Sequence, residues 1–275
     1  MAKLKHIFDT TFSHHWHGNA RELVELRSSR WWLSFYGAEA PVKKITLASL
    51  DRAIKVLQDK GNKASTINSK LSCLRVALEF TRKRGMHTVG VNVPRLKHAS
   101  DERTEYFSEE EQADVEAAIG DEDFRALFIW SIETGLRPSE SARLTKKDIR
   151  YDPALGWTVI VRESKNGDPR VVPLTRNAVN AWESVTTFQP FKAHVISKHW
   201  SRLRRAAPEV AGTFVFYTCR HTCATRLLSR GVNIKVVQSW MGHRDISMTM
   251  RYAKLIPMDL ATARDLIEAS HTTNA

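Results

Sequence analysis

Cysteine is scarce in this chain, with only Cys73, Cys219 and Cys223 among 275 residues. Three is an odd number, and the spacing fits no disulfide framework of the kind that stabilises small secreted proteins. The scarcity argues against a disulfide-stabilised extracellular protein and favours a reducing compartment. We therefore expect the protein to act in the cytoplasm, either at the nucleoid or elsewhere in a host cytoplasm.

Long apolar runs are also missing. No stretch approaches the roughly 20 consecutive apolar residues that a membrane-spanning helix requires. No apolar block typical of a secretory signal occurs in the first residues, MAKLKHIFDTTFSHHWHG. We therefore expect neither a membrane-spanning segment nor a membrane partner.

Acidic residues are fewer than basic ones. Lys and Arg number 42 against 30 Asp and Glu, which gives a formal net charge of +12. Such an excess raises the local concentration of a polyanion and speeds encounter with it. Charge alone is equally compatible with an ordinary solvated basic surface. It makes nucleic acid a candidate partner without locating a site.

The first hundred residues have helical periodicity. Apolar residues recur at helical spacing, and each run ends at a glycine, in segments 20–37, 46–61 and 65–85. We expect residues 1–16 to be a flexible terminus and residues 17–100 to form a helical DNA-binding domain. Its basic residues, Lys70 and Arg75 among them, are typical of a solvated helix face, but beside a second basic domain they favour DNA contact.

Residues 101–256 combine helices with short strands. A polar stretch containing Pro94 precedes them, so we place the domain boundary near residue 100. Asn166-Gly167, a strong hairpin signal, lies between two β-branched runs, WTVIVRE and PRVVPL. The expected fold class is mainly α with a small β-sheet (α+β). Residues 257–275 are expected to form a C-terminal helix or tail.

Four segments of this second domain place cationic or nucleophilic side chains beside helix ends. In TGLRPSE, Gly135 ends one helix and Pro138 suits the first turn of the next. Arg137 therefore lies in extended backbone near free amides that favour an anion, and Glu140 can orient its guanidinium. Taken alone, this segment is at least as typical of a structural Arg–Glu pair.

The other three segments follow in order along the chain. Lys165 lies on the expected hairpin, and Arg220 lies in the first turn of a helix. His243 directly follows a glycine at a helix end, and Tyr252 is carried by the next helix. Taken alone, Lys165 is more typical of an exposed turn residue and Tyr252 of a packing residue, and any one of these motifs is a weak signal.

In combination, these motifs resemble the catalytic domain of tyrosine recombinases, the phage integrase family. They occur in the family's order, as TGLRPSE, a hairpin lysine, CRHTCATRLLSRG and WMGHRDISMTMRYA. The resemblance spans residues 109–256, more than half of the chain. It implies an N-terminal helical core-binding bundle and a C-terminal catalytic domain that clamp duplex DNA.

The resemblance also implies a role for each motif residue. Tyr252 is the nucleophile that forms a 3′-phosphotyrosyl link, Lys165 is the general acid for the leaving 5′-oxygen, and Glu140 braces the site. The residues that bind the scissile phosphate are Arg137, Arg220 and His243.

The chemistry fits these residue types without appeal to the family. A phosphodiester gains negative charge in the transition state, and arginines and an imidazole offer fixed donors to its oxygens. Cationic neighbours help to ionise a phenol, whose pKa is ordinarily about 10. A phosphotyrosine conserves the phosphoester, so rejoining needs no ATP, and the sequence has no GxxxxGK[ST] loop. We expect no cofactor and no metal.

One position departs from the family pattern. The family usually has a histidine three residues before the second arginine, whereas this chain has Tyr217. A phenol can donate and accept a hydrogen bond but does not become a cation, so we expect Tyr217 to keep a phosphate contact and lose an acid/base role. His221 is an alternative substitute, which we favour less because adjacent helical residues point about 100° apart.

Further basic residues are expected to contact the DNA backbone. The segment FKAHVISKHWSRLRRAA predicts an amphipathic helix whose basic face either lies on DNA or is merely solvated, and two lysines follow the first arginine motif. The predicted contacts here are Lys146, Lys147, Lys192, Lys198, Arg202, Arg204 and Arg205.

The resemblance implies a site-specific DNA recombinase, or integrase, that integrates or excises a phage or other mobile element. Its partners are double-stranded DNA and three further copies in a homotetramer on paired sites, with accessory DNA-bending proteins possible. The C-terminal segment then docks on a neighbouring protomer or folds back on its own core. Two alternatives are a type IB topoisomerase-like enzyme and a catalytically silent DNA-binding protein with the same fold, which Tyr217 favours.

Overall fold

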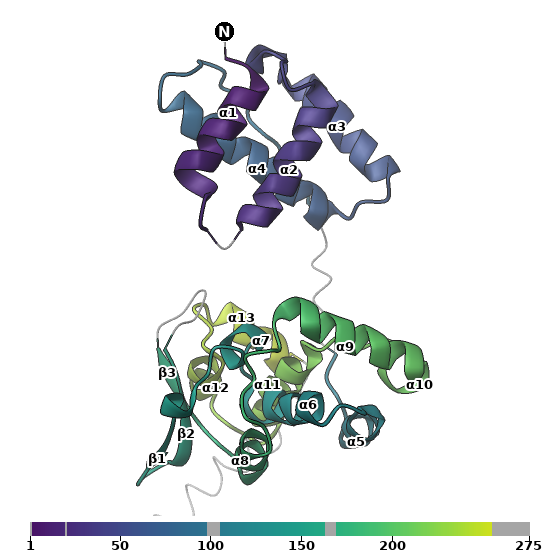
Figure 1. Ribbon diagram of the computed structural model, residues 1–275, viewed down its shortest axis with the longest axis vertical. Helices are drawn as coiled ribbons and strands as arrows, with labels where there is room; N and C mark the ends of the chain where they lie inside the picture. Colours follow the sequence, from purple (N-terminus) through teal and green to yellow (C-terminus); the bar gives the residue numbers. More distant parts are fainter. Residues whose placement is uncertain (1, 20, 98–104, 163–168, 255–275) are drawn as a thin grey trace, which may run out of the picture. The chain divides into compact units, whose positions relative to one another are not determined.

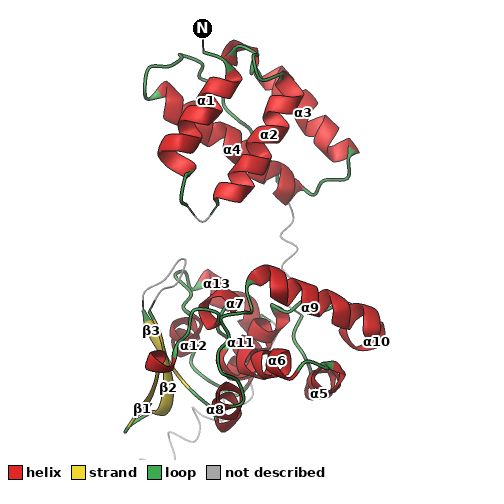
Figure 2. Cartoon of the chain, in the orientation of Figure 1, coloured by secondary structure: helices red, strands yellow, loops and turns green. Residues whose placement is uncertain are grey.

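The structure, a computed structural model, describes residues 2–19, 21–97, 105–162 and 169–254. It divides into two compact units, Met1–Asp101 and Glu102–Ala275, each with its own core (Figure 1). The fold is mainly helical with one small sheet in the second unit, as the sequence predicts (Figure 2). None of the described helices has the length and apolar character needed to cross a membrane.

The first unit is a helical bundle. A π-helix, Phe12–Trp16, extends the first helix, and a 3-10 turn, Val42–Lys44, precedes the third. The α-helices described here are α1 (Leu4–Thr11), α2 (Glu22–Tyr36), α3 (Leu47–Asp59) and α4 (Ala64–Arg82). The last of these packs against the other three and buries a stripe of apolar residues at helical spacing in the core.

The expectation of a flexible terminus at residues 1–16 is wrong. Leu4, Ile7 and Phe8 lie one turn apart on α1 and are buried in the core of the first unit, as is Trp16. The Leu4 amide also donates to the Ala40 carbonyl at 2.8 Å. A helix this short is marginal in isolation, so packing against the bundle stabilises it.

The second unit contains the remaining elements. Its described helices are α5 (Glu109–Ala118), α6 (Glu122–Thr134), α7 (Pro138–Ser141), a 3-10 turn (Lys146–Asp148), α8 (Arg176–Glu183), α9 (Ala193–Ala206), α10 (Pro208–Ala211), α11 (Thr218–Ser229), α12 (Ile234–Met241) and α13 (Ser247–Ala253). Its strands are β1 (Ile149–Asp152), β2 (Gly156–Val161) and β3 (Arg170–Pro173).

The three strands form an antiparallel sheet in the order β1-β2-β3, in which Val159 pairs with both Ile149 and Val172. On β3, Val172 is buried and its neighbour Val171 is exposed, so successive residues face the core and the solvent. On β2, Val159 and Val161 are buried on the core face. The predicted hairpin runs are β2 and β3. The β1 segment, IRYD, was missed because it lacks an alternating apolar pattern.

Helix α11 lies among the other helices of this unit, with the sheet at one edge (Figure 1). It packs against α6, α12 and α13, and its residues Thr218–Thr225 are all buried. The link from α6 to α7, the start of β3 and the link from α12 to α13 are consequently brought together beside the first turns of α11.

Candidate active site

Arg137 and Glu140 come from the turn between α6 and α7. Gly135 ends α6 in the left-handed conformation, with φ 63°, and Pro138 begins α7. The Arg137 guanidinium donates from Nη1 to Glu140 Oε1 at 2.8 Å, and its backbone amide donates to Oε2 at 2.9 Å. Its Nη2 also points to the Gly242 carbonyl at 3.4 Å. The predicted pair thus forms and reaches the end of α12.

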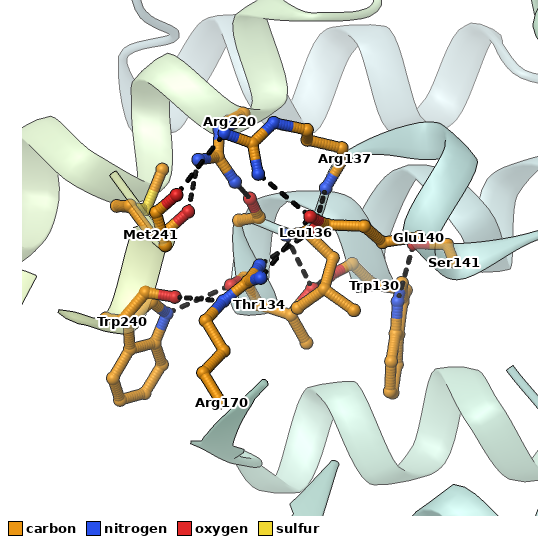
Figure 3. A network of polar contacts seen from close by, with 12 residues as sticks. Trp130, Thr134, Leu136, Arg137, Glu140, Ser141, Arg170, Arg220, Trp240 and Met241 are labelled. Atoms are coloured by element: carbon orange, nitrogen blue, oxygen red, sulfur yellow. Dashed lines mark hydrogen bonds and ion pairs between the residues drawn. The ribbon is translucent and has the colours of Figure 1, made fainter. Parts of the chain in front are cut away.

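A second arginine, Arg170 at the start of β3, binds the same carboxylate. Its Nη2 donates to Glu140 Oε2 at 2.7 Å and its Nη1 to Oε1 at 3.3 Å, while Nε donates to the Trp240 carbonyl at 2.9 Å. Figure 3 shows Arg137 and Arg170 approaching Glu140 from different sides. Sequence reasoning missed Arg170. The available signal was its position directly before Val171 and Val172, a β-branched pair in which Val172 is buried in the core.

The charge state of Glu140 follows from these contacts. Burial by itself would raise the pKa of the carboxyl group, but the hydrogen bonds and charges of Arg170 and Arg137 outweigh it and lower the pKa to about 2. Glu140 is therefore an anion at neutral pH. It fixes two guanidinium groups in place, as a bracing residue is expected to do.

Arg220 lies in the first turn of α11 and is almost fully buried, with 1% of its side chain exposed. Its Nη1 donates to the Gly135 carbonyl at 2.5 Å, and its Nη2 donates to the Met241 carbonyl. These bonds anchor the guanidinium between the ends of α6 and α12 (Figure 3). The buried Nε has no hydrogen-bond partner among the described residues, which leaves a donor for an anion.

His243 directly follows Gly242, the left-handed residue at the end of α12. Its Nδ1 lies 2.8 Å from the Thr249 hydroxyl, and its side chain is buried. Burial, followed by the charges of Arg220 and Arg137, lowers the pKa of His243 to about 3. The imidazole is therefore neutral at neutral pH, and when Nδ1 accepts from Thr249 the proton lies on Nε2.

Tyr252 projects from α13 and is 2% exposed. Its ring stacks on His243, with 6.2 Å between centroids and 11° between planes. Burial raises the pKa of Tyr252 to about 12, although the nearby charge of Arg220 acts in the opposite direction. The free protein thus holds Tyr252 as a neutral phenol.

The Tyr252 hydroxyl lies 2.8 Å from Nδ1 of His221. His221 is 6% exposed, whereas Tyr217, one turn earlier on the same face, is 39% exposed, and its side chain contacts the His221 ring edge-on. Adjacent residues of α11 point apart, as helix geometry predicts: Arg220 points to Met241, and His221 points to α13. That divergence does not by itself favour Tyr217 over His221, because the Tyr252 hydroxyl lies on the His221 side.

The remaining predicted residues are distributed as follows. Lys165 lies outside the described residues. The seven predicted DNA contacts of the second unit are all exposed. Two lie on the 3-10 turn, one is the residue before α9, and four lie on α9: Lys146, Lys147, Lys192, Lys198, Arg202, Arg204 and Arg205.

In the first unit, Lys70 and Arg75 are only partly exposed. The Lys70 ammonium lies 5.7 Å from the centre of the Trp31 ring, and burial lowers its pKa. Arg75 donates from Nη2 to the carbonyls of Val93 and Pro94. Part of the hydrogen-bonding capacity of Arg75 is therefore used within the unit.

The arrangement suits a negatively charged substrate. Fixed guanidinium groups and a neutral imidazole surround a buried phenol, so positive charge is concentrated beside a nucleophile. No group of three or more His, Cys, Asp or Glu side chains within the described ranges is arranged to hold a metal ion. Cys219 and Cys223 are buried, and burial raises both thiol pKa values, so they pack as small apolar groups.

Comparison with known proteins finds integrases and tyrosine recombinases as relatives. A sequence model of the phage integrase family matches residues 186–257. The integrase of Escherichia phage P2 is 26% identical over 227 residues, covering 81% of this chain and 65% of the relative. Tyrosine recombinase XerA of Thermococcus onnurineus is 28% identical over 155 residues, covering 51% of this chain and 54% of the relative. The chain matches about half to two thirds of these relatives' length.

Solved structures share the fold. The Tn1549 transposon integrase in complex with circular intermediate DNA has a TM-score of 0.71 at 18% identity, covering 92% of this chain and 95% of that chain. A lambda integrase tetramer bound to a Holliday junction has a TM-score of 0.71 at 17% identity, covering 91% and 77%. The motifs, their arrangement around Tyr252 and these relatives agree: this chain is similar to the tyrosine recombinases of the phage integrase family.

Proposed function

We propose that this protein is a site-specific DNA recombinase that cleaves and rejoins DNA through a 3′-phosphotyrosine at Tyr252. The observation that carries the proposal is the convergence of Arg137 and Arg220 on the segment that presents His243 and Tyr252. The names of its relatives, integrase and tyrosine recombinase, support the same activity.

The reaction follows from these side chains. The non-bridging oxygens of the scissile phosphate accept hydrogen bonds from Arg137, Arg220 and Nε2 of His243, which stabilise the charge that develops in the transition state. The Tyr252 oxygen forms a bond to phosphorus, and the bond to the 5′-oxygen breaks. Lys165 donates a proton to that leaving oxygen. Attack by a 5′-hydroxyl of a second strand then reverses the step.

Double-stranded DNA is the proposed substrate, and the basic residues of α9 are proposed to bind its backbone. The lysine and arginine side chains of α9 are exposed, and none of them is in an ion pair within the described part of the chain: Lys198, Arg202, Arg204 and Arg205. Phosphate contacts of this kind supply affinity without sequence information. Lys146 and Lys147 are proposed to extend the same contact, and Lys70 and Arg75 to add contacts from the first unit.

The proposed assembly is a homotetramer on two paired DNA sites, acting in the host cytoplasm on a phage or other mobile element. The lambda integrase structure is a tetramer on a Holliday junction, which supports this assembly by analogy. Exchange of the C-terminal segment between protomers belongs to the same proposal, and residues 257–275 lie outside the described residues. Cofactors are not needed for the proposed steps.

A pool of nicked suicide duplexes with a randomised core tests the cleavage step. After attack, the nick lets the short fragment that carries the new 5′-hydroxyl diffuse away, so rejoining is prevented and the covalent protein–DNA adduct accumulates. We expect the wild type to form an adduct that is absent from Tyr252→Phe, and sequencing the captured DNA identifies the target site. Arg220→Lys is expected to bind the site and lose about 10²–10³-fold in adduct rate. Its matched control is Arg226→Lys on the same helix, where Arg226 binds Gln112.

The captured site then separates the alternatives. Binding without any adduct from the wild type supports the catalytically silent protein and overturns the enzyme. Strand exchange between two labelled duplexes supports a recombinase, whereas relaxation of a supercoiled plasmid without exchange supports the topoisomerase-like enzyme.

A further inference from the structure

The hydrogen bond between His221 and Tyr252 links two neighbouring helices of the site. His221 on α11 is buried, and its Nδ1 lies 2.8 Å from the Tyr252 hydroxyl on α13. The two ring centroids are 5.5 Å apart with 46° between the ring planes, so the rings are tilted toward each other and not stacked. Tyr217, at the position where the family usually has its histidine, contacts the His221 ring and makes no hydrogen bond to Tyr252 within the described residues.

The direction of this hydrogen bond follows from the two protonation states. Burial raises the pKa of Tyr252 to about 12, so the phenol keeps its proton at neutral pH and needs an acceptor. The described contacts of the Tyr252 hydroxyl supply one acceptor, Nδ1 of His221. A neutral imidazole that accepts at Nδ1 carries its own proton on Nε2.

Burial and the charges around His221 keep its imidazole neutral in the free protein. Burial, followed by the charges of Arg251 on α13 and Arg220 on α11, lowers the pKa of His221 to about 4. A phosphodiester held by Arg220 would offset these positive charges and raise the proton affinity of His221. Other titratable groups face the pair as well: Tyr217 and Cys223 of α11 raise the pKa of Tyr252, and the His243 ring stacks on the Tyr252 ring.

We propose that His221 orients Tyr252 and accepts its proton as Tyr252 attacks the phosphate, an acid/base role that the phenol of Tyr217 cannot take. The inference rests on the proposed recombinase function. The Tyr252 oxygen–phosphorus bond forms while the phenol proton moves to Nδ1 of His221. The bond to the 5′-oxygen breaks, and Lys165 supplies the proton of that leaving group. In rejoining, the proton returns from Nδ1 to the phenol.

The free protein provides a first test that needs no DNA. Nitrogen-15 NMR distinguishes the two neutral tautomers of a histidine, and the His221 signal is assigned by its loss in His221→Asn. We expect the Nε2-protonated tautomer at neutral pH, with Nδ1 shifted by the hydrogen bond, and a change in that shift in Tyr252→Phe. An Nδ1-protonated His221 would overturn the proposal, because it has no lone pair for the phenol proton.

The rate of adduct formation on the captured duplex provides the second test. Asparagine places an oxygen near the position of Nδ1, so His221→Asn keeps an acceptor but takes up no proton. We expect its rate to fall by about 10²–10⁴-fold, the usual contribution of a general base. We also expect the wild-type rate to be independent of pH above the pKa of His221, where the imidazole is neutral. The His221→Asn rate should rise about tenfold per pH unit, because without a base only the phenolate form of Tyr252 reacts. His199→Asn on α9 is the matched control.

A duplex with sulfur in place of the bridging 5′-oxygen separates proton removal from Tyr252 from protonation of the leaving group. A leaving thiolate needs no protonation, so this substrate should relieve Lys165→Ala and leave His221→Asn slow. Equal rates and pH profiles for wild type and His221→Asn would overturn this inference and leave the recombinase intact. A faster His221→Asn would also overturn it, by making His221 a restraint on Tyr252. Absence of any wild-type adduct would overturn the proposed function itself.

Discussion

Arg170 and Glu140 form a two-point ion pair between β3 and α7, with Nη2 2.7 Å from Oε2 and Nη1 3.3 Å from Oε1. Both side chains are buried, and the remaining Nε of Arg170 binds the Trp240 carbonyl of α12. One guanidinium thus joins the sheet, the Arg137 turn and the helix that precedes His243. Arg170 therefore holds Glu140, the carboxylate that positions Arg137, and the end of α12 in fixed relative positions.

Removal of this guanidinium is expected to destabilise the protein strongly. Arg170→Ala leaves Glu140 buried with only Arg137 as a charged partner, and breaking a buried pair costs about 3–5 kcal/mol in the free energy of unfolding. Arg162→Ala is the matched control, because the Arg162–Asp148 pair is largely exposed on the arginine side and is worth about 0–1 kcal/mol. Urea unfolding measures both. Equal losses would contradict the bracing role of Arg170.

Stability is expected to fall as the pH drops below about 6.5. The folded protein lowers the pKa of His221 from 6.5 to about 4 and that of His243 from 6.5 to about 3. The unfolded chain therefore binds protons first, so the stability from neutral imidazoles is complete above pH 6.5 and is lost toward these folded values. Glu140 adds a further loss below pH 4.5, as the pH falls toward its folded pKa of about 2.

Urea unfolding across this pH range measures the effect. His221→Asn removes one of the two imidazoles, so its stability should decline less steeply between pH 6.5 and pH 4. A wild-type stability that does not change over this range would show that neither histidine is held neutral.

Gly242 is expected to tolerate no side chain. Its φ is +61°, and a Cβ there would lie 2.8 Å from Nη1 of Arg170, which Glu140 and Trp240 hold in place. Gly61→Ala is the control, because Gly61 has a φ of +73° and open space around it, so its cost is the backbone strain of about 1–2 kcal/mol alone. Gly242→Ala should lower the unfolding free energy by more than Gly61→Ala and slow adduct formation. Similar effects for both would contradict the close packing.

Neutralising α9 is expected to weaken DNA binding in a salt-dependent manner. Lys198 and Arg202 are exposed and four residues apart, so they lie on one face of the helix. Each phosphate contact that is lost should reduce the slope of log affinity against log salt by about one. Fluorescence anisotropy with the captured duplex measures this slope. Lys55→Ala, whose ammonium pairs with Asp59, is the control, and an unchanged slope for Lys198→Ala would remove α9 from the interface.

Local sequence patterns predicted much of the site. Gly135 and Pro138 mark a helix end and a helix start, so the extended placement of Arg137 between them follows from backbone preferences over a few residues. The same reasoning located His243 after Gly242 and Tyr252 on a helix. The hairpin strands followed from alternation and the Asn-Gly turn.

Longer-range contacts were beyond these patterns. The N-terminal helix is stable because Leu4, Ile7 and Phe8 enter a core formed largely by α4, whose contribution is invisible in sixteen residues of sequence. Arg170 appeared to be one more basic residue because Glu140, its partner, is thirty residues away.

The sequence by itself determined which chemical groups this protein places at helix ends and in what order, since helix and turn preferences act over three or four residues. Only the tertiary structure decided which of those groups meet. The packing of α13 against α11 brings Tyr252 to His221 rather than to Tyr217, and the position of β3 brings Arg170 to Glu140. Such contacts depend on how whole elements bury their apolar faces, a property of the complete core.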